Sequence, residues 1–285
     1  MPYLSHELVT PSNAGMGGHE GVADNYKPGY VRLRMYGAGE KRLDNLSTSH
    51  TLRTSTHSEG FDACVVPTLV DHETRRVVVD SYEICAYLDQ AVAYHPLLPD
   101  DGTKETEIME QVRRVDTTPH PGLLYAFHKE DPRPEFLQKA MTGIYDRKID
   151  MLTQMIGENG DDTQLVKAYQ AKIKREEGGR ELQYDDMFHS RIMEEFRGLI
   201  AGLEQQLASH DDPWVCGPEF TLADCCWGIS LFRMHWAGRA FLWADAPAVK
   251  DYAFRCYRRP SILGSTISWP SPAPPSPHTS DIPVQ

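Results

Sequence analysis

Two short motifs have the residue types of a binding site for a small polar ligand. Val66-Pro67 interrupts an apolar run, and Asp80-Ser81 opens the next helical pattern. A helix start favours an anion, because its first N–H groups are unpaired and the helix dipole is positive there. A cis peptide is accessible at Val66-Pro67, since it costs only about 0.5–1 kcal/mol before proline. Each motif also has a plainer explanation: Ser81 caps its own helix, and Pro67 ends a strand.

Thiol and imidazole side chains are the other groups that could do chemistry. A free thiol, with a pKa of about 8.5, is only a few per cent ionised at neutral pH, so a nucleophilic thiol needs stabilisation. Cys64, three residues before Pro67, is a weak catalytic candidate, although a small residue filling a turn explains it more simply. His120, in Thr118-Pro-His-Pro121, could deprotonate a phenol or equally cap a broken helix.

Composition excludes several classes of partner. The net charge of −12 argues against nucleic acid, whose binding needs clustered Lys and Arg. No signal-peptide pattern begins the chain and no window is long enough to span a bilayer, so we expect no membrane partner. The six cysteines contain no C-x-x-C pair and the 12 histidines no H-E-x-x-H motif. We therefore expect no metal, and reduced thiols in the cytoplasm.

The elements that position the two motifs can be read from the residue pattern. The run 64–70, the polar turn 71–76 and Val77–Val79 predict a β-hairpin, with Pro67 at a strand start or an edge. Asp80-Ser81 then caps a helix with apolar residues at helical spacing. Residues 30–35 fit a strand or a helical turn equally, and 10–26 and 37–58 read as loops.

A proline-rich stretch at 95–102 marks the predicted domain boundary. We expect an α/β domain over 1–95, an all-helical domain over 103–264 and a Pro-rich tail over 265–285. Thr221 and Asp224 form a predicted capping box ahead of an apolar helix that should run through the middle of its domain. The last residues, 269–285, hold six prolines and suggest a disordered or polyproline-II-like extension. The predicted helices cover 104–118, 134–157, 162–177, 185–209, 225–236 and 247–258.

These motifs together resemble the glutathione transferase superfamily. The resemblance rests on Val66-Pro67, on Asp80-Ser81 opening a helix, and on Gly217 followed by Phe220-Thr-Leu-Ala-Asp224. The chain is most similar to the glutathione-dependent reductive dechlorinases of chlorinated hydroquinones. The similar stretches are 30–34, 58–62, 65–74, 116–120 and 133–135.

The resemblance implies a fold, a co-substrate and residue roles. The fold would be an incomplete thioredoxin-like α/β domain followed by an all-α domain, with glutathione as co-substrate and a homodimer as the assembly. Val66 and Pro67 would hold the cysteinyl backbone of glutathione as an added strand does. Ser81 would take the γ-glutamyl carboxylate, and Asp80 the ammonium or a neighbouring donor. Found together at this separation, the two motifs favour binding over the plainer explanations.

The sequence departs from the family at the catalytic step. The similarity begins near Ser5–Val9, which resembles the second strand, and no cysteine precedes Cys64. We expect the first β-α unit and its catalytic cysteine to be absent, so the thiolate-activating residue is unidentified. Either residues precede Met1 in the whole protein, or this is a divergent member with altered chemistry. Aromatic residues that could line a substrate pocket, or belong to the core, are Tyr125, His128, Trp227, His235 and Trp236.

The resemblance predicts an enzyme acting on an aromatic small molecule. It would attack a hydroquinone or quinone through glutathione, by conjugation or by reductive dehalogenation. One alternative is a tailoring enzyme of an aromatic polyketide pathway. Another is a non-catalytic binding protein that kept the fold.

Overall fold

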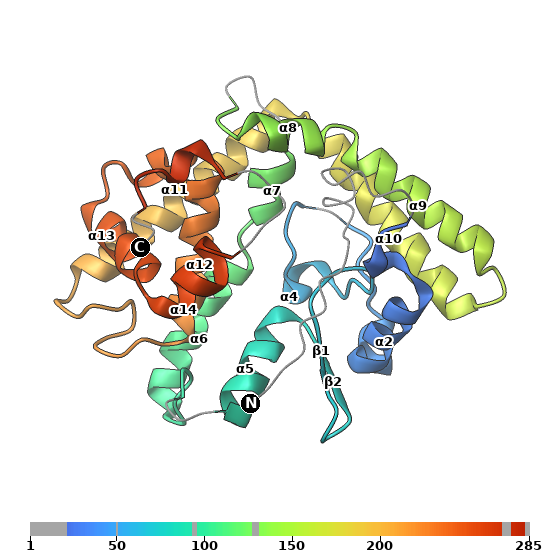
Figure 1. Ribbon diagram of the computed structural model, residues 1–285, viewed down its shortest axis with the longest axis horizontal. Coiled ribbons are helices and arrows are strands. Elements are labelled where there is room, and N and C mark those ends of the chain that lie inside the picture. The colour runs from blue at the N-terminus through green and yellow to red at the C-terminus, as the bar shows by residue number, and fades with distance from the viewer. Residues whose placement is uncertain (1–21, 50, 93–95, 127–130, 270–274, 283–285) are drawn as a thin grey trace. The chain divides into compact units, whose positions relative to one another are not determined.

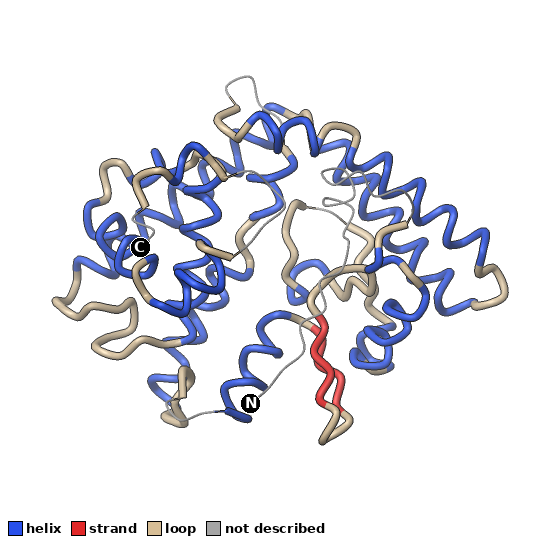
Figure 2. The backbone as a smooth tube through the Cα atoms, in the orientation of Figure 1, coloured by secondary structure: helices blue, strands red, loops and turns tan. Residues whose placement is uncertain are grey.

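The computed structural model describes residues 22–49, 51–92, 96–126, 131–269 and 275–282. In this part of the chain the secondary structure is helical apart from one two-stranded sheet, drawn in red in Figure 2. Of the helices in these ranges, none is long and apolar enough to cross a membrane. The chain divides into two compact units: unit 1 is Met1–Tyr94 with Ala140–Gln183, and unit 2 is His95–Lys139 with Tyr184–Gln285.

Unit 1 contains the sheet and the helices around it (Figure 1). In chain order its elements are η1 (Asp24–Tyr26), α2 (Pro28–Ala38), α3 (Glu40–Leu43), α4 (Thr56–Glu59), β1 (Thr68–Asp71), β2 (Arg76–Val79), α5 (Ser81–Val92), α9 (Ile144–Glu158) and α10 (Thr163–Leu182).

The predicted hairpin is present, and α5 follows it directly. Strands β1 and β2 are antiparallel, and Thr68 lies opposite Val79. Pro67 immediately precedes β1, where its missing N–H removes no ladder hydrogen bond. Residues 30–35, for which the sequence allowed a strand or a helix, belong to helix α2, which packs against β2. The segment 5–9, predicted to be a strand, lies outside the described residues.

The hairpin of α9 and α10 belongs to unit 1, although the sequence analysis assigned these residues to the helical domain. Helix α10 packs against α9 and α2, and α9 also contacts η1. Buried Leu152, Leu165 and Tyr169 join Tyr26 and Val31 in one apolar core. The Tyr169 hydroxyl donates to the Tyr26 carbonyl over 2.5 Å. Apolar spacing predicts that a helix is buried, but it does not say against which part of the chain.

The named elements of unit 2 within its described residues are all helices, joined by loops. Its elements are α6 (Gly102–Asp116), α7 (His120–Tyr125), α11 (Asp186–Ala208), α12 (Leu222–Trp236), η2 (Ala240–Trp243), α13 (Pro247–Tyr257), α14 (Pro260–Ile262), η3 (Leu263–Ile267) and η4 (Pro277–Thr279), and α8 (Glu135–Met141) crosses the division between the units.

Helix α12 is central in unit 2, as the sequence predicted from its apolar character. It packs against α6, α13, α14 and η4. The predicted capping box is present: Asp224 accepts from the Thr221 N–H over 2.8 Å, and Thr221 caps the helix in return. A Cβ on Gly228 would lie 2.8 Å from Ile262, so this helix approaches its neighbour closely. Because these elements and η2 surround α12, its burial does not depend on one amphipathic face.

The Pro-rich tail differs from its prediction of a disordered extension, which is wrong for residues 275–282. There η4 packs against α12, and the Ser276 hydroxyl donates to the Trp236 carbonyl over 2.6 Å. Ile282 is buried, and His278 lies 2.6 Å from the Pro132 carbonyl oxygen. Proline content does not predict this order, because one buried apolar residue and two side-chain hydrogen bonds are enough to order a short segment.

Candidate functional site

The two motifs singled out in the sequence meet at one end of the β-hairpin. Because Thr68 pairs with Val79, the residues just outside this pair, Pro67 and Asp80, lie at the same end of the sheet. The hairpin therefore brings Val66-Pro67 and Asp80-Ser81 together in space. Sequence analysis proposed this grouping from a resemblance, and the antiparallel register supplies its structural basis.

The Val66-Pro67 peptide bond is cis, as the sequence analysis anticipated. The Val66 side chain is 44% exposed. Within the described residues, neither the N–H nor the C=O of Val66 has a hydrogen-bond partner. An exposed residue with both backbone groups free is a ready edge for an added peptide strand.

Asp80 and Ser81 divide two tasks between them. One Asp80 carboxylate oxygen accepts from the Tyr82 N–H over 3.0 Å, and the other from the Thr56 hydroxyl over 2.7 Å. Asp80 therefore caps α5, and its φ of +95° turns the chain from β2 into the helix. Ser81 is exposed, and its hydroxyl has no partner among the described residues. The plainer explanation, that Ser81 caps its own helix, is not what the geometry shows.

Three side chains from η1 and α2 fix the backbone of the segment Cys64–Pro67. Asn25 donates to the Cys64 carbonyl over 2.7 Å, and the Tyr30 hydroxyl donates to the Val65 carbonyl over 2.9 Å. Arg34 donates to the Pro67 carbonyl. The segment lies outside the β-ladder, so side chains replace the strand partner that it lacks.

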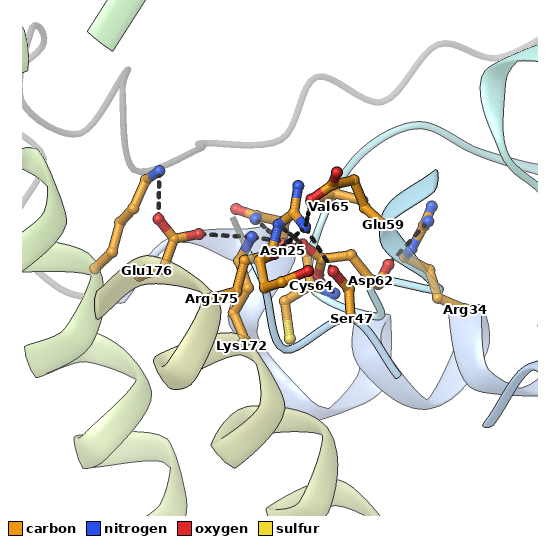
Figure 3. Close-up of polar contacts among 12 residues, drawn as sticks. Asn25, Arg34, Ser47, Glu59, Asp62, Cys64, Val65, Lys172, Arg175 and Glu176 are labelled. Atoms are coloured by element: carbon orange, nitrogen blue, oxygen red, sulfur yellow. Dashed lines mark hydrogen bonds and ion pairs between the residues drawn. The ribbon is translucent and has the colours of Figure 1, made fainter. Parts of the chain in front are cut away.

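A charged cluster of six buried or half-buried residues connects the preceding loop to α10 (Figure 3). Lys172 lies 2.6 Å from Asp62 and 2.7 Å from Glu176, which in turn lies 2.9 Å from Lys148. The three cations and three carboxylates balance in charge, which a site this far from water requires. The members of the charged cluster are Glu59, Asp62, Lys148, Lys172, Arg175 and Glu176.

Arg175 extends the charged cluster to the loop 47–59. Its guanidinium donates to the Ser47 hydroxyl over 2.5 Å and to the Ser49 carbonyl over 2.7 Å. It also donates to the Arg53 carbonyl and lies 3.4 Å from Glu59. Only a planar fork with several donors can satisfy this many acceptors at once, so lysine would not replace it.

The charged cluster keeps Asp62 ionised. Burial raises the pKa of Asp62, but Lys172 and then Arg175 outweigh it, so that the pKa lies below its ordinary value. Sequence analysis missed this cluster. One signal was present: Lys172, Arg175 and Glu176 continue the buried stripe of α10 that Leu165 and Tyr169 begin.

Cys64 has the properties of an inert core thiol. It is fully buried, and burial together with the nearby Asp62 carboxylate raises the pKa of its thiol. A reactive cysteine needs access and a lowered pKa, and Cys64 has neither. The small residue filling a turn, which the sequence analysis preferred, fits these observations.

His120 is the first residue of α7 and is buried, with Nε2 3.3 Å from the Ser230 hydroxyl. Burial, with a smaller contribution from Arg233, lowers the pKa of His120 to about 3. A base is most effective when its pKa is near the working pH, so His120 is neutral and weakly basic. This favours a structural role at the broken helix over proton abstraction.

The other aromatic candidates divide between core and partial exposure. Trp227 is buried and donates to Gln111 over 3.1 Å, and His235 is also buried. Trp236 and Tyr125 are half-buried, and His128 lies outside the described residues. In the described ranges, His, Cys, Asp and Glu form no group arranged to hold a metal.

Comparison with known proteins gives concordant matches along most of the chain. The family described as "Glutathione S-transferase, C-terminal domain" matches residues 186–253. The chain is 40% identical over 257 residues to a 2,5-dichlorohydroquinone reductive dechlorinase of Sphingobium indicum strain B90A, covering 88% of this chain and 73% of that protein. The enzyme of the same name from strain UT26 is 40% identical over 256 residues, with the same coverage.

Solved structures with a related course of the chain include two bacterial proteins. Maleylacetoacetate isomerase from Methylobacterium extorquens AM1, solved with malonate and glutathione, has a TM-score of 0.48 at 16% identity over 88% of this chain and 83% of its own. A glutathione S-transferase from Rhodospirillum rubrum F11 has a TM-score of 0.42 at 18% identity, over 76% of this chain and 78% of its own.

The fold is that of a glutathione S-transferase, with a small α/β part and a helical part. On the strength of the 40% identity, the chain belongs to the reductive dechlorinase branch of the glutathione S-transferase superfamily.

Proposed function

We propose that this chain is a glutathione-dependent enzyme that removes a halogen reductively from a chlorinated hydroquinone. The observation that carries the proposal is the 40% identity to two 2,5-dichlorohydroquinone reductive dechlorinases over 88% of the chain. The backbone groups of Val66 and the hydroxyl of Ser81 have no hydrogen-bond partner in the described ranges and lie at the same end of the hairpin, which supports the binding of glutathione. The enzyme would work in the cytoplasm, where thiols stay reduced.

The reaction needs two electrons, and two glutathione molecules supply them. The first thiolate adds to the ring, chloride leaves, and a carbon–sulfur bond forms. A second thiolate attacks that sulfur, the carbon–sulfur bond breaks, and the ring carbon takes a proton. The products are the hydroquinone with hydrogen in place of chlorine, chloride, a proton and glutathione disulfide. Because Cys64 is buried, a second glutathione is the better attacking thiol than this cysteine.

Ser81 provides the sharpest test of the binding part of the proposal. Asp80 caps α5, and the Ser81 hydroxyl bonds to no described residue, so Ser81→Ala should not lower stability. If the hydroxyl takes the γ-glutamyl carboxylate, the same change should raise the Kd for glutathione about 10-fold, as loss of a hydrogen bond to a charged group does. Isothermal titration calorimetry measures the Kd, and urea unfolding measures the stability.

Turnover tests the reaction itself. The full chain is incubated with glutathione and 2,5-dichlorohydroquinone, while chloride, glutathione disulfide and the aromatic product are quantified together. The expected result is one disulfide and one chloride for each hydroquinone that loses a chlorine. If a glutathione conjugate accumulates and no glutathione disulfide forms, the enzyme is a simple transferase and not a reductive dechlorinase. Binding of glutathione with no turnover of any quinone would favour a non-catalytic binding protein.

A further inference from the structure

The Cys64–Pro67 segment is fixed from two directions, by η1 and α2 on one side and by Asp62 on the other. Asn25, Tyr30 and Arg34 of η1 and α2 hold its carbonyl groups. On the other side, one Asp62 carboxylate oxygen accepts from the Cys64 N–H over 2.9 Å. Asp62 is therefore the residue through which a second element reaches the segment.

That second element is helix α10, which lies about 110 residues further along the chain. The other Asp62 oxygen lies 2.6 Å from Lys172 Nζ and 3.5 Å from Arg175 Nε. The side chains of these three residues are between 5% and 12% exposed. Figure 3 shows Lys172 and Arg175 reaching from α10 toward Asp62 and the loop. A carboxylate held by two buried cations has little freedom to rotate.

Helix α10 is itself bonded to α9 and to the loop before Asp62, so it cannot shift independently of them. Lys172 bonds Glu176 on the same helix, and Glu176 bonds Lys148 of α9. Arg175 donates to the carbonyl groups of Ser49 and Arg53, so the loop before Asp62 is hydrogen-bonded to the same helix. The carboxylate of Asp62 is thus held by the α9–α10 hairpin, while Arg34 of α2 donates to its backbone carbonyl over 3.3 Å.

We propose that Asp62 is a positioning residue of the glutathione site, and that the α9–α10 hairpin orients the Val66 backbone through it. This inference rests on the proposed function. A bound peptide pairs well with backbone groups only if these groups are held within about 0.5 Å of the productive geometry. In active sites, a misplacement of about 1 Å can lower the reaction rate about 100-fold. The Asp62–Cys64 bond lies two residues from Val66, so its loss tilts the peptide that glutathione pairs with.

The decisive variant is Asp62→Asn, which keeps the size and an acceptor for the Cys64 N–H but removes the charge that Lys172 holds. The Kd for glutathione should rise about 10-fold, while turnover at saturating glutathione stays within about 2-fold of wild type. This split between binding and turnover distinguishes positioning from a general loss of active protein. An unchanged Kd in the folded variant overturns the proposal.

Glu59→Gln is the matched control. Glu59 is another buried carboxylate beside Arg175, but among the described residues it contacts Thr51 and Arg175 and no part of the segment. Its loss should lower the melting temperature as Asp62→Asn does and leave the Kd within about 2-fold. An equal rise in Kd for Glu59→Gln would mean that any damage to the charged cluster weakens binding, and would overturn the specific role of Asp62.

A milder variant covers the case in which Asp62→Asn does not fold. Lys172→Arg keeps the cation, but a guanidinium cannot place one nitrogen against both Asp62 and Glu176 in the same geometry. The Kd should then rise about 3-fold, and no change would contradict the proposal. Failure of the wild-type chain to bind glutathione at all would instead remove the proposed function, so the two failures are distinguishable.

Discussion

Two sites of buried carboxylates, one in each unit, are satisfied in different ways: the charged cluster of unit 1 and Asp224 of unit 2. In unit 1, the charged cluster sets three carboxylates against three cations, between a loop and α10. In unit 2, Asp224 is fully buried, and its donors among the described residues are neutral: Thr221, the Val215 N–H over 3.0 Å and the Tyr252 hydroxyl over 2.7 Å. One arrangement joins distant segments by charge, and the other closes a helix terminus with local hydrogen bonds.

The two arrangements differ in how well the sequence predicts them. Thr221 and Asp224 are three residues apart, and their pattern announces the capping box directly. Asp62 and Lys172 are 110 residues apart, and neither position differs in type from an ordinary surface charge. A charged cluster is also more sensitive to the loss of one member, because the remaining charges stay buried without a counter-ion.

The largest expected effect comes from Glu176, which lies between two buried lysines. Glu176→Gln should lower the free energy of unfolding by about 3–5 kcal/mol, since Lys148 and Lys172 lose the carboxylate within 2.9 Å of each. Far-UV circular dichroism in urea measures it. The control is Glu110→Gln, which breaks an exposed pair with Arg114 and should cost under about 0.5 kcal/mol. Equal losses of unfolding free energy in Glu176→Gln and Glu110→Gln would contradict the expected difference between a buried and an exposed carboxylate.

A smaller effect is expected at the capping box of unit 2. Asp224→Ala leaves the Val215 N–H, the Thr221 N–H and the Tyr252 hydroxyl without their acceptor and should cost about 3 kcal/mol. All five tryptophans belong to unit 2, so their fluorescence follows this unit selectively. Thr221→Ser keeps the capping hydroxyl and should change the midpoint little. A loss below 1 kcal/mol for Asp224→Ala would show that water replaces the carboxylate.

Acid should affect the two units over different pH ranges. The pKa of His120 falls from its ordinary 6.5 to about 3 in the folded chain, so between these values the unfolded chain binds a proton that the folded one does not. Unit 2 therefore loses stability as the pH falls from 6.5 toward 3, by at most about 1.4 kcal/mol per pH unit. His120→Gln should flatten this slope, read from tryptophan fluorescence in urea at stepwise pH. The same slope in wild type and variant would rule out His120 as its source.

The stability of unit 1 should depend on pH through Asp62, at lower pH than the stability of unit 2 depends on His120. The pKa of Asp62 lies below the ordinary value near 3.8, so its contribution is complete above that pH and is lost as the pH falls through the folded value. Circular dichroism at pH 5 should therefore detect no loss from this residue, and Asp62→Asn should differ from wild type less at pH 3 than at pH 7. An undiminished difference at pH 3 would contradict the assignment.

The smallest effect is expected at the tail of unit 2. Ser276→Ala removes two hydrogen bonds, one to the Trp236 carbonyl and one from the His278 N–H, and should cost about 1–2 kcal/mol. The measurement is again tryptophan fluorescence in urea. Ser280→Ala, in the turn that follows η4, is the control, because its exposed side chain lies outside this contact and its loss should leave the midpoint unchanged. If Ser276→Ala also has no effect, the tail contributes to the fold through Ile282 and the His278 contact with Pro132.

Local pattern determined much of this protein. The hairpin, the helix opened by Asp80-Ser81, the capping box of α12 and the central course of that helix all follow from residues a few positions apart. So does the grouping of Val66 with Ser81, once the hairpin register is known. These features depend on hydrogen bonds and apolar spacing within one or two elements, which a sequence displays openly.

Tertiary structure alone decided which part of the chain α9 and α10 join, and which charges are buried. Lys172 and Arg175 look like a solvated face until Asp62 and Glu59 are brought against them. The described part of the Pro-rich tail, residues 275–282, likewise owes its order to contacts with α12 and with Pro132. The physical reason is the same in each case: burial and electrostatic pairing depend on neighbours in space, and these neighbours are separated by dozens of residues in the chain.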